Sequence, residues 1–393
     1  MGSDRHLLAS LIALALIAGP WAAPLHAQGL HPGGSVLIEA QPWEEAQKLF
    51  RTDVHWLGGD GASSVDLGDE RVLWLFGDSF VNPAGSRSRR DAALVRNSVA
   101  IQKGYAPATA KMTFSWRTLG NRPRSFFHEE GTEWFWPGSG IRIRDVLLLF
   151  LMRVRRTENA LGFEPSGWKA VLVPNPDSPP TLWGMVNPRV PKTGRILVGS
   201  SSVVIADGFL YAFGTDGKDQ SVYTVRWPLA DAAGGTLLNP QWWVGPDRGW
   251  TGALAPGHRP VPVFTGGQAE FTVHFEPDLK GFIQVQTLSL ADPCLAARFT
   301  GGISLPWSVP ECFFQPPERA VRGLLIYAGK AHKVFEGADL AFTYAVNTMD
   351  VERLMSDMEI YYPVVLKGSF TVKPQERAGE DHAPQVPGAS QGH

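Results

Sequence analysis

Four acidic side chains stand where predicted strands begin or end, and they are the first candidates for chemistry: Asp60, Asp78, Glu133 and Glu270. Hydrolysis of a glycosidic bond needs one carboxylic acid to protonate the leaving oxygen and one carboxylate to activate water or attack the sugar. We expect Asp60 to be the base or nucleophile, because the glycines on both sides of it allow a substrate to approach closely. Glu270 or Glu133 is then the expected acid, and Asp78 a further member of the site.

A second group of residues could bind the sugars of a polymer. Tryptophan rings offer flat apolar faces for sugar rings, and hydroxyl, carboxylate, ammonium and imidazole groups can bond to sugar hydroxyls. The candidates are Trp56, Trp134, Trp136, Ser201, Asp216, Lys330 and His332. We expect the two basic residues to contact hydroxyls or an anionic group.

Each of these residues also has a purely structural alternative. Asp60 could cap a turn with its side-chain oxygen, as Asp does in many loops. Asp78 could bind the backbone of a neighbouring sheet, and Glu133 and Glu270 could be solvated ends of strands. The tryptophans could pack between sheets, and His332 could brace a loop. The sequence leaves these alternatives open.

Other chemistries find little support in the sequence. It has no Cys-x-x-Cys pair and no His-Glu-x-x-His motif for zinc. Residues 199–203 lack the second glycine of a serine nucleophile elbow, and residues 59–64 lead into a strand where a phosphate-binding loop would lead into a helix. We therefore expect no cofactor and no dedicated metal site. A single cation such as calcium, bound at the centre of the fold, stays an open possibility, because it needs only converging oxygens.

The elements that must position these residues are repeated β-hairpins. Residues 63–67 and 72–78 follow the same plan as residues 201–205 and 209–216: a strand, an acidic turn, an aromatic strand, then a glycine and an aspartate. Weaker copies are residues 139–150 and 270–285, and a fifth pairs residues 312–315 with 323–328. The copies are 42 (312 − 270) to 76 (139 − 63) residues apart, which is enough for the strands of a propeller blade.

The repeats predict an all-β fold, a five-bladed β-propeller. In a propeller the first strand of each hairpin starts, and the second ends, at one mouth of the central channel. Asp60 and Asp78, which are 78 − 60 = 18 positions apart, are therefore expected to be neighbours there. A β-sandwich is the competing architecture, but it would not require hairpins that resemble one another.

Composition narrows the class of protein. The 393 residues are 44% hydrophobic and include 42 Gly, 31 Pro and 14 Trp, which favours a large core of short strands joined by tight turns. Lys and Arg total 36 against 38 Asp and Glu, a formal charge of −2. No basic excess exists to neutralise a phosphate backbone, so a nucleic acid is not an expected partner. We expect a polysaccharide or oligosaccharide as partner and a monomeric protein.

The two ends of the chain predict export and a tail. Residues 1–27 have a basic start, an apolar run over residues 7–19 and a small residue at a cleavage point, which is typical of a secretory signal peptide. No segment is long enough to span a bilayer. We therefore expect a secreted or periplasmic protein with a lead-in over residues 28–50, the propeller over 51–370 and a flexible tail over 371–393. Outside the cell, Cys294 and Cys312 could form a disulfide or remain buried thiols.

Several motifs also carry a family resemblance. They are residues 56–63 (WLGGDGAS), 73–80 (LWLFGDSF), 96–98 (RNS), 133–138 (EWFWPG), 343–347 (TYAVN) and 357–363 (DMEIYYP). With these motifs the chain, from about residue 56 to 368, resembles a family of exported bacterial five-bladed propellers. That family was long catalogued as a domain of unknown function, includes endo-D-arabinanases and is similar in fold to arabinanase and xylosidase propellers.

The resemblance implies a glycoside hydrolase that acts on an arabinan-like or other furanosidic polysaccharide. It also implies that Asn97 lies near the mouth, although Asn97 could instead tie neighbouring sheets together through backbone bonds. A non-catalytic carbohydrate-binding propeller and a structural or partner-binding envelope propeller remain the alternatives.

Overall fold

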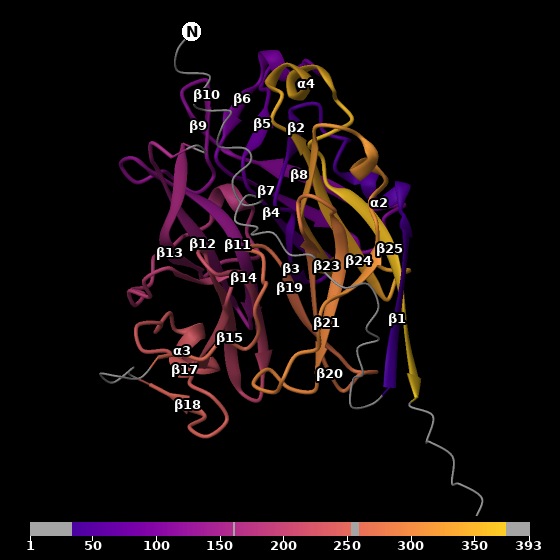
Figure 1. Ribbon diagram of the computed structural model, residues 1–393. Coiled ribbons are helices and arrows are strands. Elements are labelled where there is room, and N and C mark those ends of the chain that lie inside the picture. The colour runs from indigo at the N-terminus through magenta and orange to yellow at the C-terminus, as the bar shows by residue number, and fades with distance from the viewer. Residues whose placement is uncertain (1–33, 160–161, 253–258, 375–393) are drawn as a thin grey trace, which may run out of the picture.

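The computed structural model describes residues 34–159, 162–252 and 259–374, and strands dominate all three ranges (Figure 1). The fold is therefore all-β, as predicted. The predicted signal peptide lies outside the described residues, and so does the predicted tail apart from residues 371–374. In the part of the chain that the structure describes, no helix is long and apolar enough to cross a membrane.

Five antiparallel sheets follow one another along the chain, and we number them in that order. The first sheet consists of β3 (Ser63–Gly68), β4 (Arg71–Phe76), β7 (Ser98–Lys103) and β8 (Lys111–Ser115), and the second of β11 (Glu133–Ile143), β12 (Val146–Arg156) and β13 (Phe163–Val173). The third consists of β14 (Ile196–Ala206), β15 (Phe209–Asp216), β16 (Val222–Pro228), β17 (Gln241–Trp243) and β18 (Trp250–Thr251). The fourth consists of β19 (Thr272–Glu276), β20 (Gly281–Leu288), β21 (Cys294–Thr300) and β22 (Glu311–Phe314), and the fifth of β23 (Leu324–His332), β24 (Leu340–Thr348), β25 (Val364–Pro374) and β1 (Gly34–Pro42).

The remaining elements are short. Two small sheets contain β2 (Trp56–Gly59), β5 (Ser79–Val81) and β6 (Ala93–Val95), and β9 (Arg117–Leu119) and β10 (Arg122–Arg124). The helices are α2 (Glu44–Leu49), α3 (Leu229–Ala233), α4 (Val351–Ser356) and the 3₁₀ turns η2 (Arg89–Asp91), η3 (Pro180–Leu182) and η4 (Pro317–Ala320). They lie in the segments that connect strands.

Tight turns make the predicted hairpins. Asp69 and Glu70 join β3 to β4 with φ of 50° and 55°, and Asp207 and Gly208 join β14 to β15 with φ of 48° and 77°. Two successive residues with positive φ twist the turn in the sense that matches paired strands, which is why Asp and Gly recur there. The predicted hairpins over residues 63–76, 139–150, 201–216 and 270–285 are therefore confirmed.

The fifth predicted hairpin is wrong. Residues 311–314 form β22, which pairs with β21 at the outer edge of the fourth sheet, and β23 pairs with β24. A disulfide between Cys294 and Cys312 joins β21 to β22, with 5.9 Å between the two Cα atoms. This covalent bond fixes the sheet to which β22 belongs, and the strand pattern alone carries no such information.

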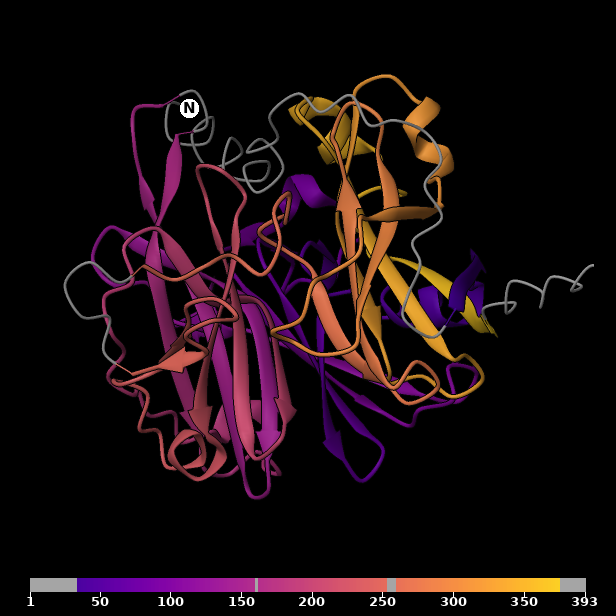
Figure 2. The ribbon, with the colours of Figure 1, turned by 60° about the horizontal axis from the view of Figure 1, so that its bottom comes forward.

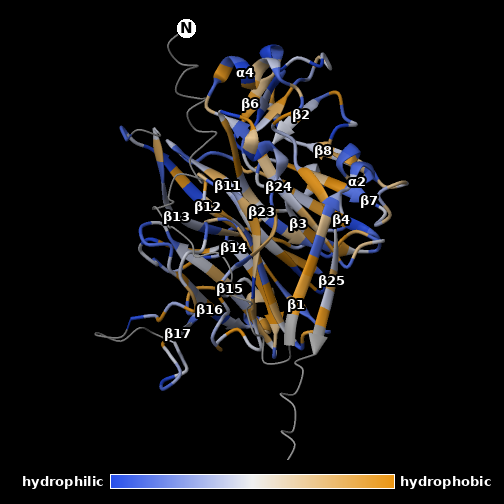
Figure 3. Cartoon of the chain, turned by 45° about the vertical axis from the view of Figure 1, so that its right-hand side comes forward, coloured by the Kyte–Doolittle hydropathy of each residue, from blue (hydrophilic) through white to orange (hydrophobic). Residues whose placement is uncertain are grey.

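The hydrophobic core is divided among the contacts between successive sheets. One cluster, with Leu73 and Leu149, lies between the first and second sheets. Corresponding clusters join the second to the third, the third to the fourth and the fourth to the fifth. A further cluster, with Trp74 of β4 and Ala341 of β24, lies between the fifth sheet and the first. Figure 3 shows the apolar residues concentrated on these strands and the polar residues on the surrounding loops.

Successive sheets along the chain lie side by side (Figures 1 and 2). Their first strands contact each other in the order β3, β11, β14 and β19, and β19 contacts β23. The fifth sheet also contacts the first, because the His332 imidazole of β23 bonds through Nδ1 to the Ser64 hydroxyl of β3, at 2.7 Å.

The N-terminal segment completes the fifth sheet. Residues 34–42, which fall in the predicted lead-in, form β1 and pair antiparallel with residues 366–374 of β25. Figure 1 shows this indigo strand beside the yellow C-terminal one. The two ends of the described chain are thereby joined by backbone hydrogen bonds, so residues 34–42 of the lead-in are part of the fold.

Candidate active site

A break in the first sheet creates the site. The small sheet β2-β5-β6 repeats the order β3-β4-β7, and each of its strands is continuous in sequence with the corresponding strand of the first sheet. Strand pairing is therefore interrupted at the same height in three neighbouring strands, at residues 60–62, 77–78 and 96–97. This level places Asp60, Asp78 and Arg96 side by side, because neighbouring strands are only about 4.8 Å apart.

Asp78 is the buried member of the group, with 1% of its surface exposed. Its carboxylate accepts hydrogen bonds from Arg96 Nη1 at 3.0 Å and from the indole nitrogen of Trp136 at 2.8 Å. Burial raises the pKa of Asp78 to about 6, against the opposing influence of Arg96 and Trp136. The Arg96 guanidinium also lies over the Trp134 ring, 4.4 Å from its centroid.

Asp60 is the partly exposed member. One of its oxygens accepts a hydrogen bond from the Tyr327 hydroxyl at 2.8 Å, and the other occupies space that is free only because residue 77 is glycine: a Cβ there would lie 2.4 Å from it. Burial raises the pKa of Asp60 well above its ordinary value, and the charges of Asp78 and Glu270 raise it further. As a whole residue, Asp60 is partly exposed.

Glu270 is the third carboxylate of the cluster. It lies two residues before Thr272, where β19 begins, and forms a salt bridge with Lys330 of β23, at 2.6 Å, with 12% of the glutamate side chain exposed. The same ammonium group donates to the carbonyl oxygen of Gly61. Lys330 therefore ties Glu270 to the loop that carries Asp60.

A bulge in β23 brings two of these partners to one side. The pairing of β23 with β24 shifts register between Tyr327 and Lys330, and Ala328 between them has a φ of 56°. Residues three apart on a regular strand point to opposite faces. The bulge instead allows Tyr327 to reach Asp60 and Lys330 to reach Glu270, which is the kind of redirection that bulges near active sites provide.

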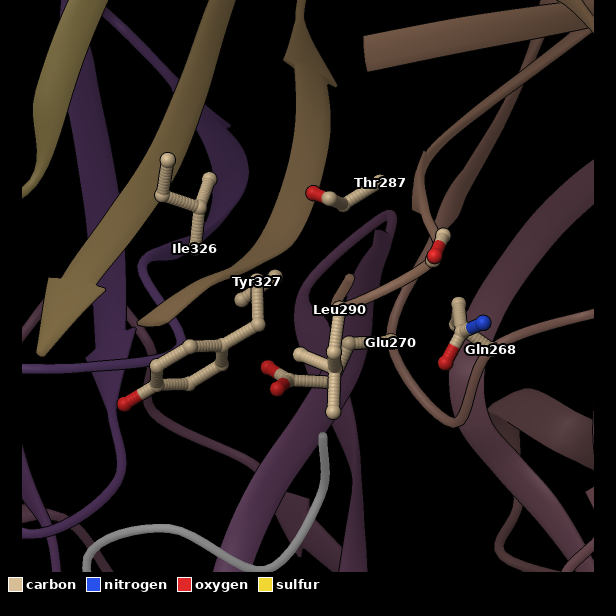
Figure 4. A pocket seen from close by; sticks show the side chains of 8 residues that line it. Gln268, Glu270, Thr287, Leu290, Ile326 and Tyr327 are labelled. Carbon is tan, nitrogen blue, oxygen red and sulfur yellow. The ribbon is translucent and has the colours of Figure 1, made fainter. Parts of the chain in front are cut away.

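A hollow opens beside Glu270. Its lining residues come from the segment before β19, from β20 and the loop after it, and from β23: Gln268, Glu270, Thr287, Ser289, Leu290, Ile326, Tyr327 and Ala328. Figure 4 shows the Glu270 carboxylate directed toward the side of the hollow where Tyr327 lies. A small molecule in the hollow would therefore lie against both Glu270 and the tyrosine that bonds to Asp60.

This arrangement is suited to proton transfer. Three carboxylates interact electrostatically, and the two with raised pKa values, Asp60 and Asp78, differ in access to water. Of the three carboxylates, Glu270 is the one that lines the hollow, and Asp60 is bonded to Tyr327, which lines it too.

Glu133 lies on the other side of β11 from the cluster. Trp134 and Trp136 face Arg96 and Asp78, so Glu133 points the opposite way, as successive residues of a strand do. Its carboxylate accepts hydrogen bonds from Arg153 and Ser166, both at 2.7 Å. Burial opposes these bonds, but together they hold the pKa of Glu133 below its ordinary value. We therefore no longer assign the acid role to Glu133.

The predicted tryptophans pack inside the protein. Trp56 is fully buried, stacks on Phe114 with 4.3 Å between ring centroids and donates to the Ser98 hydroxyl. It has no surface for a sugar ring, so we assign it to packing. Trp134 and Trp136 are 3% and 6% exposed, and they support Arg96 and Asp78 directly.

Two predicted binding residues also join sheets together. Asn97 is fully buried and bonds to the backbone of Phe127 and Phe135, so it holds the chain before β11 in place. His332 is 1% exposed and both ring nitrogens have partners, Ser64 and Thr343. Burial holds the pKa of His332 well below its ordinary value. The neutral ring acts as a structural bridge.

The other two predicted residues lie around the third sheet. The buried Ser201 hydroxyl donates to the carbonyl oxygen of Ala269, directly before Glu270. Asp216 forms a salt bridge through both oxygens with Arg195, at 3.0 Å each. Burial opposes this salt bridge, yet the pKa of Asp216 stays below its ordinary value. Ser201 helps to position Glu270, whereas Asp216 is committed to its arginine.

Two residues of the site were not selected from the sequence. Tyr327 bonds to Asp60, and the buried Asn347 donates to the Tyr327 hydroxyl at 3.2 Å. Asn347 belongs to the motif over residues 343–347, so the resemblance held a signal for it. Tyr327 lies within an apolar strand, and only the bulge reveals its role. Among the described residues, no group of three or more His, Cys, Asp or Glu is arranged to hold a metal ion.

A family model described as "Domain of unknown function (DUF5005)" matches residues 44–361. The chain belongs to this family. Every residue of the carboxylate cluster and its partners falls within the DUF5005 match. None of the curated proteins matches the sequence.

Solved structures show a similar fold. A Bacteroides ovatus ATCC 8483 protein, provisionally described as a hydrolase, is similar at a TM-score of 0.66 and 13% identity, over 89% of this chain and 97% of that one. This likeness shows the fold alone. The GH62 α-L-arabinofuranosidase catalytic domain of Coprinopsis cinerea has a TM-score of 0.45 and 10% identity over 86% and 98% of the two chains. For the Cellvibrio cellulosa α-L-arabinanase the values are 0.43 and 11% over 80% and 91%. The last two likenesses are too weak to carry an argument.

Proposed function

We propose that the protein is a glycoside hydrolase with Asp60 and Glu270 as its catalytic pair. The observation that carries this proposal is the meeting of Asp60 and Asp78, at the break in the first sheet, with Glu270 from the segment before β19. Burial and the two neighbouring charges raise the pKa of Asp60 well above its ordinary value. Asp78 is buried and bonded to Arg96 and Trp136. It would influence the protonation of Asp60 through its charge, without contacting the substrate.

The surroundings of the two accessible carboxylates suggest their roles. Asp60 favours its protonated form, so it would donate its proton to the glycosidic oxygen as the bond from that oxygen to the anomeric carbon breaks. Glu270 is ion-paired with Lys330 and would act as a carboxylate, either removing a proton from water or attacking the anomeric carbon. These roles are the reverse of those that the sequence predicts.

The wider proposals concern architecture, location and substrate. The five successive sheets and the clusters between them support a five-bladed propeller. The disulfide between Cys294 and Cys312 supports export, because such bonds persist in oxidising compartments. An arabinan-like or other furanosidic polysaccharide is the proposed substrate, on the basis of the motif resemblance.

The roles can be tested with two kinds of substrate. Asp60→Asn should lower the rate of polysaccharide cleavage about 10²- to 10⁴-fold. It should retain much more activity on a dinitrophenyl arabinofuranoside, whose leaving group needs no proton. Glu270→Gln should lose activity on both. Glu276→Gln is the matched control, because Glu276 ends the same strand and is paired with Lys333.

Two outcomes would contradict the proposal. Full polysaccharide cleavage by Asp60→Asn or Glu270→Gln would exclude that residue from the chemistry. If the wild-type protein binds arabinans but cleaves none of a panel of polysaccharides and aryl glycosides, the carbohydrate-binding alternative is correct.

A further inference from the structure

We propose that Tyr361, which Arg89 holds in place, is a positioning residue that fixes Asp60 beside Asp78. For its effect on catalysis this inference rests on the proposed function, whereas the position of Asp60 can be measured without any reaction. Tyr361 lies between α4 and β25, and Figures 1 and 3 show α4 at the same end of the molecule as the small sheet β2-β5-β6.

Tyr361 holds the backbone of Asp60 from two sides. Its carbonyl oxygen accepts a hydrogen bond from the N–H of Gly59, the residue before Asp60, at 3.0 Å. Its hydroxyl donates to the carbonyl oxygen of Asp78 at 2.9 Å, and the same oxygen accepts from the N–H of Asp60 at 3.4 Å. Burial raises the pKa of Tyr361 well above its ordinary value, so the hydroxyl keeps the hydrogen that it donates.

A third hydrogen bond ties Tyr361 to the fifth sheet. Its N–H donates to the carbonyl oxygen of Val346 in β24, at 2.9 Å. The three partners of Tyr361 therefore come from three of the motifs that carry the family resemblance, and Tyr361 comes from a fourth. These motifs are residues 56–63, 73–80, 343–347 and 357–363. Four segments that lie apart in the sequence thus meet at one buried residue.

The backbone of Tyr361 has a conformation that its contacts must maintain. Its φ is 65°, in the left-handed region, which a bulky residue rarely adopts. Its carbonyl oxygen also lies so close to residue 58 that a Cβ there would collide with it, and residue 58 is glycine. Such conformations persist only where the surrounding structure enforces them, and they cluster at functional sites.

Arg89 supplies that support. Its side chain is fully buried and donates to four backbone carbonyl oxygens: those of Leu57 at 2.9 Å, Leu354 at 2.9 Å, Asp357 at 2.8 Å and Ile360 at 2.5 Å. Its guanidinium also lies over the Tyr361 ring, 5.8 Å from the centroid. Arg89 therefore fixes the segment that leads to Tyr361 against β2, the strand that leads to Asp60. A lysine cannot reproduce this set of bonds, because its ammonium group lacks the planar fork of donors.

The groups around Asp60 give the inference a measurable sign. The titratable side chains that act on Asp60 are Asp78 at the same break, Glu270 before β19, and Tyr327 and Lys330 of β23. Burial and, after it, the two acids raise the pKa of Asp60, whereas the two residues of β23 lower it. Tyr361→Phe removes the bond to the Asp78 carbonyl, which should let the two aspartates separate and let water reach them. Both changes weaken the influences that raise the pKa of Asp60, so this pKa should fall.

Carbon-13 NMR of protein labelled at the aspartate carboxyl groups measures this pKa, with Asp60→Asn to identify the signal. We expect the Asp60 signal of Tyr361→Phe to titrate at a lower pH than that of the wild type. Tyr344→Phe is the matched control, because Tyr344 is a buried tyrosine of β24 whose hydroxyl bonds to Glu318. It should titrate like the wild type. Thermal melting should show that both variants are folded.

Catalysis gives a second measurement. Tyr361→Phe should lower kcat on a polysaccharide about tenfold and leave KM nearly unchanged, because a displaced acid slows the reaction without altering the contacts of the substrate. The alkaline limb of the pH–rate profile should move to lower pH. Arg89→Lys should have at least the same effects. The double variant should be no slower than Arg89→Lys, because Arg89 acts through Tyr361.

The outcomes separate this inference from the proposed function. If Asp60 titrates in Tyr361→Phe as it does in the wild type, Tyr361 only supports the fold, whatever its effect on the melting temperature. A rise in the pKa of Asp60 would also overturn the inference, since it would mean that the hydroxyl acts on the carboxyl group directly. A lower pKa in a protein that cleaves no glycoside would support the positioning role while refuting the hydrolase proposal.

Discussion

At the scale of single residues, Asp60 is defined by opposing influences. Burial and the charges of Asp78 and Glu270 favour its protonated form, while the Tyr327 hydroxyl and the Lys330 charge favour the carboxylate. A carboxylic acid that keeps its proton near neutral pH can act as a general acid. The side chains around Asp60 can therefore be used to test its role.

Tyr327→Phe removes the hydrogen bond that stabilises the Asp60 carboxylate, so the pKa of Asp60 should rise further. An acid loses activity as the pH rises through its pKa, and the alkaline limb of the pH–rate profile should therefore move to higher pH. Tyr344→Phe, whose hydroxyl bonds to Glu318, should leave the profile unchanged. A shift of the acidic limb instead would identify Asp60 as the base.

Asp60→Asn should stabilise the fold at neutral pH. The folded protein raises the pKa of Asp60, so the stability linked to its proton is complete below the unfolded pKa of about 4 and is lost as the pH rises through the folded pKa. An amide cannot lose this proton, so the variant should gain about 1 kcal/mol at pH 8 and little at pH 4. Urea unfolding at the two pH values measures the difference. Equal stabilities at pH 8 would contradict the cost assigned to the buried charge.

At the scale of elements, irregularities in strands position the site. The first sheet parts where Asp60, Asp78 and Arg96 lie, and the bulge of β23 turns Tyr327 and Lys330 to one side. Register shifts also occur at Pro137–Ser139 of β11 and Val198–Ser202 of β14. The first strands of several sheets therefore contain irregularities in their pairing. Such bulges are common near functional sites.

Gly77→Ala tests the space kept open at the first of these breaks. The added Cβ would lie 2.4 Å from an oxygen of Asp60, so the carboxylate must move while the backbone can stay. We expect polysaccharide cleavage to fall by about 10²-fold, because a displacement of about 1 Å can have that effect. The melting temperature should change little. Gly252→Ala, which meets no atom within 4 Å, is the control. Full activity of Gly77→Ala would show that the position of the Asp60 carboxylate is unimportant.

At the scale of the whole molecule, contacts between the first and fifth sheets hold the two halves of the site together. Asp60 and Asp78 come from the first sheet, whereas Tyr327 and Lys330 come from the last. These sheets share the cluster that contains Trp74 and the hydrogen bond between Ser64 and His332. The pairing of β1 with β25 completes the last sheet.

Deletion of residues 34–42 should therefore weaken the fold as a whole. It removes nine residues of pairing with β25 and leaves β25 as an unpaired edge, which is a site for aggregation. We expect a lower melting temperature, loss of solubility on mild heating and loss of cleavage together. Truncation that begins at residue 34, and so keeps β1, is the control. An unchanged melting temperature in the deletion would show that β1 is dispensable.

The repeated part of this protein could be predicted from the order of its residues alone. Alternating apolar strands and positive-φ turns such as Asp207–Gly208 depend on neighbours in the chain, so four hairpins and the all-β class could be predicted. The proximity of Asp60 and Asp78 followed from the hairpin between them. Residue type alone suggested that Asn97, Trp56 and His332 bind a substrate, yet all three are buried between sheets.

Only the tertiary structure decided the rest, because those features depend on contacts between distant segments. The disulfide assigned β22 to the fourth sheet, and β1 joined a strand more than 300 residues away in sequence. The meeting of Glu270 with Asp60 and the contact of Tyr327 with Asp60 likewise depend on packing between sheets and on a one-residue bulge. The position of Glu133 depends on its partners Arg153 and Ser166. A bulge reverses which face a side chain takes, and local sequence patterns do not encode that choice.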